Sequence, residues 1–364
     1  MQHRYLSLDV FRGLTIAGMI LVNTPGHGDY AYAPLRHARW HGFTPTDLVF
    51  PSFLFIVGVA MRFSFKAYGY QLSPALRLKI LKRAVLIFGI GYLVHTFPYY
   101  TFDLSKLRIL GVLQRIALSY AAAAFLVLTV PKRHLPGVSV ALLLLYWLLL
   151  WAFGDYELTT NAVRRLDLWL MGPDHLYQGT GVAFDPEGLL STLPSVVTVV
   201  LGYLTGVAIQ ETDNRDKVIV QLVLWGIALV VVSLVWNIVF PINKALWTSS
   251  FVLITVGIDL LILPVLIWLI DVKNHRNWTT FFVVFGANSI LAYALSELLA
   301  ITLWSIPVTE PNGYQTSAYS WSYWHLFQPV FGYYPGALIW AICFVLLCWG
   351  VCYVLYRKKI FLKV

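Results

Sequence analysis

The sequence has little charge for its length. Of its 364 residues, 12% are Asp, Glu, Lys or Arg and 59% are hydrophobic, whereas roughly 25% of the residues in a soluble domain are charged. Too few polar side chains are present to cover a soluble core of this size. The alternating segments typical of a membrane β-barrel are also missing. Apolar runs of about 18 residues or more recur instead, which is the length at which a helix crosses the hydrocarbon of a bilayer.

Cysteine is scarce, and the common metal and nucleotide motifs are missing. The three cysteines, Cys343, Cys348 and Cys352, all fall in the last apolar run, so they offer no extracytoplasmic disulfide framework and no C-x-x-C pair. We expect them to pack as small apolar side chains. The sequence has no H-E-x-x-H, G-x-x-x-x-G-K-[ST] or G-x-S-x-G motif, so we expect no metal site. The formal net charge of +9 comes from basic residues between the apolar runs, where they set topology rather than bind nucleic acid.

The apolar runs predict an all-α, polytopic membrane helix bundle with about ten transmembrane helices, formed by a single domain over residues 1–364. Lys and Arg are concentrated in alternate connections, for example at Arg62, Lys66, Lys82 and Arg83. The positive-inside rule therefore places both termini in the cytoplasm. The predicted spans are 9–25, 45–62, 82–98, 109–130, 137–153, 189–209, 218–239, 248–270, 280–304 and 335–356.

The three longest connections, 26–44, 154–188 and 305–334, all fall on the predicted extracytoplasmic side. Long loops on one face of a scaffold often carry binding chemistry, although the Trp and Tyr side chains here also suit an interfacial belt. Two segments have the pattern of a helix start with a capping residue and an early proline. These are Thr44-Pro45-Thr46-Asp47, before the second span, and Asp185-Pro186-Glu187, before the sixth.

Several ionisable side chains fall inside the predicted spans, where a buried charge is costly and often marks a site. Asp9 and Arg12 are three residues apart and can pair on one helix face. Arg108 and Arg115 are seven apart, so on one helix both would face the same way and suit an anionic ligand such as a phosphate. The alternative is that these two arginines pair with buried acids of later spans. The acids in question are Asp259 and Glu297.

The densest chemistry lies in the segment HARWHGFTPTD, residues 37–47. It places the His37 imidazole just before a membrane helix and the Asp47 carboxylate inside that helix. Histidine can carry an acyl group or take a proton near neutral pH, and a carboxylate within reach would fix its tautomer. The residues alone leave two interpretations open, a catalytic pair or a surface histidine beside a helix-capping aspartate.

Seven stretches along the chain carry motifs that resemble one family. They are 8–23, 36–61, 107–120, 184–202, 240–257, 286–293 and 354–364. In this order they resemble the heparan-α-glucosaminide N-acetyltransferases, whose histidine motif is similar to H-A-x-W-N-G-L-T-x-A-D-L-V-F-P. The motif's histidine and aspartate match His37 and Asp47, whereas His41 and Phe43 stand where the family has Asn and Leu, which bears on acceptor recognition. The resemblance implies a compact bacterial homologue without the luminal domain of the lysosomal member, located in the inner membrane.

The resemblance implies a transmembrane N-acetyltransferase with acetyl-CoA as donor substrate and no metal. Its other expected partners are an amino-sugar acceptor and the lipid bilayer, and a homodimer is also compatible with the family. His37 would act as nucleophile or base, Asp47 would orient it, and Asn23 would donate a hydrogen bond to the developing oxyanion. The side chains expected to hold the donor are Arg108, Arg115, Lys244, Arg12 and Asn243. Further candidates for lining the cavity are Glu187, Trp247, Asn288 and Glu297.

Two other functions remain open from the sequence. A transporter for an amino sugar or its oligomers would also use many spans, buried charges and aromatic outer loops. However, no inverted repeat is evident, and the family-like histidine motif has no carrier role. A sensor or assembly subunit with a degenerate site is the third interpretation. The joint presence of His37, Asp47 and Asn23 argues against it.

Overall fold

The structure, a computed structural model, describes residues 5–98, 103, 105–311 and 313–362. The described chain is an all-α bundle with one small hairpin, β1–β2, so the predicted fold class is confirmed. Residues 363–364, the end of the last family-like stretch, lie outside the described residues. The α-helices and strands are α1 Leu6–Asn23, α2 Pro45–Phe65, α3 Pro74–Thr96, α4 Val112–Thr129, α5 Leu135–Phe153, α6 Ala162–Met171, α7 Thr192–Glu211, α8 Arg215–Trp236, α9 Ser249–Leu266, α10 Thr279–Ala287, α11 Ser289–Ser305, β1 Pro307–Thr309, β2 Gln315–Ser317, α12 Ala318–Ser322, α13 Gln328–Phe331 and α14 Tyr333–Arg357.

The shorter helical turns occur mainly in the connections. Five of those in the described residues are 3₁₀ turns: η1 Gly28–Tyr30, η2 Ala33–Leu35, η3 Lys66–Tyr68, η4 Lys132–His134 and η5 Pro173–His175. Two are π-helical: η6 Ile267–Val272, which continues α9, and η7 Tyr323–Phe327, which continues α12. In the hairpin, β1 and β2 are antiparallel, with Val308 opposite Thr316.

Eight helices of the described chain are long and apolar enough to cross a membrane: α1, α2, α4, α5, α7, α8, α9 and α14. The predicted span 280–304 is not one straight helix, because α10 and α11 meet at an angle of 86°. The break occurs at Asn288, whose backbone (φ −130°, ψ 46°) leaves the helical region. The remaining predicted span, 82–98, overlaps the later part of α3, a helix of 23 residues that begins at Pro74, ends at Thr96 and has basic side chains in its first half.

The two predicted helix starts have different outcomes. Thr44 caps α2 in a capping box, in which Asp47 Oδ2 accepts a hydrogen bond from the Thr44 amide at 3.0 Å. This prediction is confirmed. The second prediction is wrong, because α7 begins at Thr192, several residues after Asp185-Pro186-Glu187. The Asp185 and Glu187 carboxylates are engaged by Arg108 instead of capping a helix.

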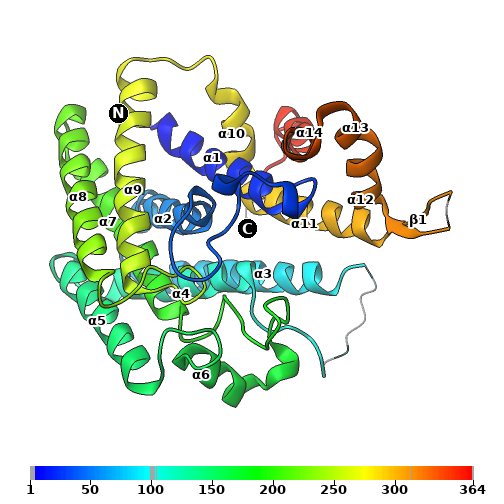
Figure 1. Ribbon diagram of the computed structural model, residues 1–364. Coiled ribbons are helices and arrows are strands. Elements are labelled where there is room, and N and C mark those ends of the chain that lie inside the picture. Colours follow the sequence, from blue (N-terminus) through cyan, green and yellow to red (C-terminus); the bar gives the residue numbers. More distant parts are fainter. Residues whose placement is uncertain (1–4, 99–102, 104, 312, 363–364) are drawn as a thin grey trace.

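The helix α2 lies in the middle of the bundle, between α1, α4, α7 and α9 (Figure 1). Its closest partner is α7, and glycines allow their backbones to touch. A Cβ atom added to Gly58 would lie 2.0 Å from the Val199 carbonyl oxygen, and one added to Gly202 would lie 2.0 Å from that of Phe55. Close approach through small residues is typical of membrane helix pairs. By contrast, α5 and α8 leave many apolar side chains exposed, which suits helices that face lipid.

Replacing Gly202 with Val tests this packing. The added side chain would overlap the α2 backbone, so we expect the free energy of unfolding of the detergent-purified protein to fall by about 3 kcal/mol or more. Gly89→Val in α3 is the matched control, because a Cβ there meets nothing within 4 Å. Equal melting temperatures for the two variants would contradict the described α2–α7 contact.

Candidate active site

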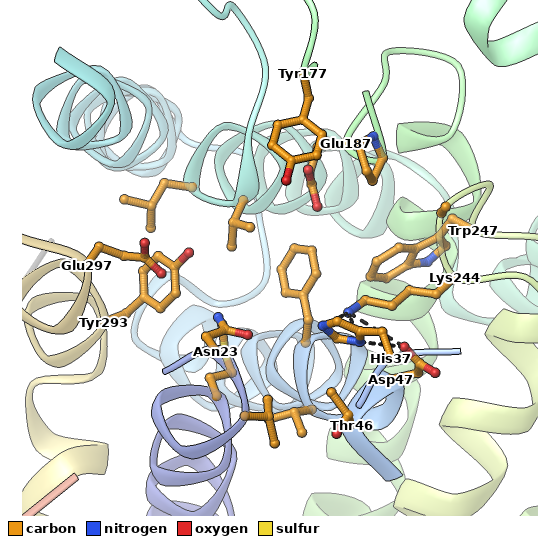
Figure 2. Close-up of a pocket in the computed structure, with 18 of the residues that line it drawn as sticks. Asn23, His37, Thr46, Asp47, Tyr177, Glu187, Lys244, Trp247, Tyr293 and Glu297 are labelled. Atoms are coloured by element: carbon orange, nitrogen blue, oxygen red, sulfur yellow. Dashed lines mark hydrogen bonds and ion pairs between the residues drawn. The ribbon is translucent and has the colours of Figure 1, made fainter. Parts of the chain in front are cut away.

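A cavity of about 900 Å³ lies at the end of the bundle where α1 and α3 end and α2 and α4 begin. The remaining walls come from α11 and from two connections, the segment around Tyr177–Glu187 and the segment Lys244–Trp247. Several predicted site residues meet here although they are far apart in the sequence (Figure 2). Those lining the cavity are Asn23, His37, Asp47, Arg108, Glu187, Lys244, Trp247 and Glu297.

The His37 and Asp47 side chains form a hydrogen-bonded pair at this cavity. The His37 Nδ1 atom lies 2.7 Å from Asp47 Oδ1. A carboxylate only accepts hydrogen bonds, so Nδ1 carries the proton and Nε2 keeps its lone pair, which the Lys244 amine approaches at 3.3 Å. Asp47 is 1% exposed whereas the His37 side chain is 47% exposed. The pair therefore combines a fixed, buried carboxylate with an imidazole that a substrate can reach.

Backbone and hydroxyl groups fix the Asp47 carboxylate in place. Its Oδ2 atom accepts hydrogen bonds from the Ala38 amide at 3.1 Å and from the Thr44 hydroxyl at 2.9 Å. The Thr44 amide completes this set. Because these donors belong to the same short loop as His37, the aspartate shapes the loop and orients the imidazole at once.

Lys244 lies directly beside this pair. Its Nζ atom is 3.1 Å from His37 Nδ1, 3.3 Å from His37 Nε2 and 3.8 Å from Asp47 Oδ1. Burial lowers the pKa of Lys244, against the opposing attraction of the Asp47 carboxylate. The sequence placed this lysine among the donor-binding residues, and the structure places its amine beside the imidazole.

Arg108 lines the cavity, but its guanidinium is already held by two carboxylates. It donates to both Asp185 oxygens at 2.8 and 2.9 Å and to Glu187 at 2.8 Å. Burial opposes the charge, but these carboxylates outweigh it and hold the pKa of Arg108 above its usual value. This arrangement ties the 185–187 segment to the cavity wall.

The prediction that Arg108 and Arg115 point the same way from one helix is wrong. Arg108 precedes α4, which begins at Val112 after an extended residue, Gly111. The buried Arg115 guanidinium instead donates to the Gly188 carbonyl at 3.0 Å and to the Ser191 hydroxyl, and it lies 5.0 Å from the centre of the Trp247 ring. It supports the cavity wall from behind.

The two arginines do not pair with the buried acids either. Among the described residues, Asp259 accepts a hydrogen bond from Ser52 at 2.5 Å, and Glu297 interacts with Tyr293. Both acids thus have partners other than Arg108 and Arg115. The alternative of pairing with Asp259 or Glu297 is therefore also wrong.

Three other candidates lie outside the cavity. Arg12 is 3.7 Å from Asp9, as the three-residue spacing predicted. The Asn243 side chain accepts a hydrogen bond from the Leu246 amide at 2.8 Å and so shapes the loop that carries Lys244. Asn288 binds the backbone of Ile360 and Leu362 near the C-terminus.

The structure also brings in side chains that the sequence analysis missed. His95, Gln114, Tyr177 and Tyr293 all line the cavity. Gln114 was the most detectable of them, because it is an uncharged polar residue inside an apolar run. His95, Tyr177 and Tyr293 are of types that are common at membrane interfaces and helix ends. Only the folded structure, which brings distant segments together, marks them as cavity residues.

Behind the cavity wall, Asp167 of α6 is fully buried. Its Oδ1 atom accepts a hydrogen bond from the Leu189 amide at 3.0 Å, whereas no group among the described residues hydrogen bonds to Oδ2. Burial raises the pKa of Asp167 to about 7. Leu189 follows the segment that carries Glu187. A negative charge on the buried Asp167 carboxyl would therefore destabilise this wall.

Comparison with known proteins gives a consistent result over the whole chain. Residues 4–162 match the family model described as heparan-alpha-glucosaminide N-acetyltransferase, catalytic. The human heparan-alpha-glucosaminide N-acetyltransferase is 31% identical over an alignment that covers 99% of this chain and 60% of the human protein. The mouse protein of the same name is 29% identical, with 100% and 61% covered. The chain thus spans about three fifths of the length of these relatives, and the family resemblance seen in its motifs is confirmed.

Asp167→Asn should remove a pH dependence of stability. The folded protein keeps the Asp167 proton up to about pH 7, whereas the unfolded chain releases it near pH 4. Wild type should therefore lose stability relative to Asp167→Asn as the pH rises from about 4 to 7, by at most about 4 kcal/mol. Thermal unfolding of both proteins across this range measures the difference, and parallel stability curves would show that Asp167 is not buried as described.

Proposed function

As a relative of the heparan-α-glucosaminide N-acetyltransferases, this protein is, we propose, a membrane acetyltransferase that moves acetyl from acetyl-CoA to the amine of a glucosamine-type sugar. The observation that carries the proposal is the His37–Asp47 pair, held at 2.7 Å on the wall of a cavity large enough for parts of two substrates. A half-exposed histidine in a fixed tautomer, with Nε2 unprotonated, suits acyl transfer as nucleophile or base.

Two routes are compatible with this geometry. In the first, Nε2 of His37 attacks the thioester carbonyl, the C–S bond breaks, and CoA leaves as a thiol or thiolate. The sugar amine then attacks the acetyl-imidazole and regenerates the histidine. In the second, Nε2 takes a proton from the amine while the amine attacks the thioester carbonyl directly, the C–S bond breaks, and His37 gives the proton to the departing CoA sulfur. In both routes Asp47 stabilises the positive charge that develops on the ring.

The thioester oxygen gains negative charge in either route. We propose that Asn23 and Lys244 donate hydrogen bonds to this oxygen and so stabilise its charge. Asn23 is the last residue of α1, is exposed at the cavity, and has a side chain with no hydrogen-bond partner among the described residues. Lys244 contributes a cation beside the same imidazole. Oriented donors of this kind stabilise an oxyanion because they need little rearrangement as the charge forms.

Of the five side chains proposed to hold the donor, Arg108 and Lys244 line the cavity. The Arg108 charge is balanced by Asp185 and Glu187, so Lys244 is the better candidate to attract an anionic donor. We further propose that one domain holds both substrates, with acetyl-CoA arriving from the cytoplasm and His37 on the opposite face. The bilayer would then separate donor from acceptor, and the acetyl group would cross through the cavity.

Substituting His37 tests its role in transfer. We expect His37→Ala to lower kcat for transfer from acetyl-CoA to glucosamine by about 10³-fold, because it removes the only group proposed to take the acyl group or the proton. His325→Ala is the matched control, since His325 is exposed and lies outside the cavity. Unchanged kcat in a folded His37→Ala protein would exclude catalysis by this residue.

Trapping separates the two routes. With radiolabelled acetyl-CoA and no acceptor, the nucleophilic route predicts label on the wild-type protein and none on His37→Ala. The label should be lost when glucosamine is added. Absence of labelled wild-type enzyme, together with normal turnover, would assign His37 to the base role.

A further inference from the structure

The cavity has further polar lining residues besides His37, Asp47 and Lys244. Glu297 and Tyr293 of α11 lie together across the cavity from His37, Asp47 and Lys244 (Figure 2). Gln114 from α4 and His95 from α3 also line the cavity. We call Glu297, Tyr293, Gln114 and His95 the second wall. None of these residues has a part in the two routes described above.

Three polar atoms of the second wall lack protein partners among the described residues. Gln114 is fully buried, yet neither its Oε1 nor its Nε2 atom has a hydrogen-bond partner in the described chain, and the same holds for His95 Nδ1. Glu297 has no Lys, Arg or His within ion-pair distance among the described residues. An unpaired buried polar group costs free energy, so a native protein keeps such groups where a ligand or water completes them.

The backbone makes room for these side chains. A Cβ atom on Gly91 would lie 2.6 Å from both polar atoms of Gln114, and one on Gly111 would lie 2.5 Å from the His95 ring. Any side chain larger than glycine at these two positions would push the amide or the imidazole aside. The glycines therefore allow both polar side chains to occupy the cavity edge.

The charges around the second wall favour an uncharged ligand. Glu297 would repel an anion. The Arg108 guanidinium disfavours a positive charge at His95 and would repel a cation there. Gln114 offers two donors and one acceptor, His95 one ring nitrogen, and Glu297 two acceptor oxygens. A hydroxyl or amide group both donates and accepts, so it can satisfy all of them, whereas an ammonium only donates and would leave the Gln114 N–H groups without an acceptor.

We propose that the second wall is a subsite for the uncharged hydroxyl or amide groups of a substrate. This inference rests on the proposed function, which supplies two sources of such groups. One is the set of hydroxyls of the sugar acceptor, bound with its amine toward His37. The other is the amide-bearing arm of acetyl-CoA, bound with its thioester toward His37.

Gln114→Leu removes the amide at similar volume. We expect the KM of one substrate to rise roughly 3- to 10-fold, the effect of one lost hydrogen bond between uncharged groups, with little change in kcat. A higher KM for glucosamine assigns the subsite to the acceptor, and a higher KM for acetyl-CoA assigns it to the donor. Gln210→Leu is the matched control, because Gln210 is on α7 outside the cavity and also has a buried amide nitrogen without a partner.

Two further variants keep the proposal falsifiable if Gln114→Leu does not fold. Gly91→Ala displaces the Gln114 amide without deleting it and should raise the same KM. Glu297→Gln should retain more binding than Glu297→Leu, because an amide oxygen still accepts from a hydroxyl or amide. Both KM values unchanged in folded Gln114→Leu or Gly91→Ala would overturn the proposal, and so would equal losses for Glu297→Gln and Glu297→Leu, which would indicate an ammonium.

Calorimetry distinguishes this proposal from the proposed function. If wild type transfers no acetyl group, the acetyltransferase proposal fails, but binding of CoA and of glucosamine can still be measured. Weaker binding of either one to Gln114→Leu and not to Gln210→Leu would then support the subsite alone. Equal binding by wild type and Gln114→Leu would overturn it.

Discussion

The candidate site depends on the burial of one carboxylate. Asp47 sits in the first turn of α2 and is 1% exposed, so it is stable there only because donors surround it. Its two oxygens accept from the His37 ring, the Ala38 amide and the Thr44 amide and hydroxyl. The same side chain therefore starts the central helix, folds the preceding loop and fixes the imidazole. Removing it would disturb the fold and the chemistry together.

Much of the fold could be predicted from the sequence, because membrane spans depend on length and hydrophobicity and need no knowledge of distant contacts. The break between α10 and α11 at Asn288 was not predicted, because it involves contacts between segments that are distant in the sequence. It depends on hydrogen bonds to Ile360 and Leu362, which are far away in the sequence. The start of α7 was misplaced because Asp185 and Glu187, which resemble capping residues, are bound by Arg108 instead.

The part of the candidate site that depends on residues close in sequence could be predicted, whereas the part that depends on distant segments could not. His37 and Asp47 are close in sequence and share a capping motif, so their contact follows from local geometry. The position of Lys244 beside them, and of Glu297 across the cavity, requires the packing of α9 and α11 against α2 and α1. The seven-residue spacing of Arg108 and Arg115 does not place them on one helix face, since α4 begins after Arg108.

The central claim is that the acetyl group is handed over at His37, and a structure of the protein with a non-hydrolysable acetyl-CoA analogue tests it most directly. The nucleophilic route predicts the acyl carbon within about 3.5 Å of His37 Nε2. The base route predicts it within about 6 Å, because the acceptor amine then lies between the two atoms. An analogue bound with its acyl group outside the cavity, beyond the reach of His37 and Lys244, would contradict it.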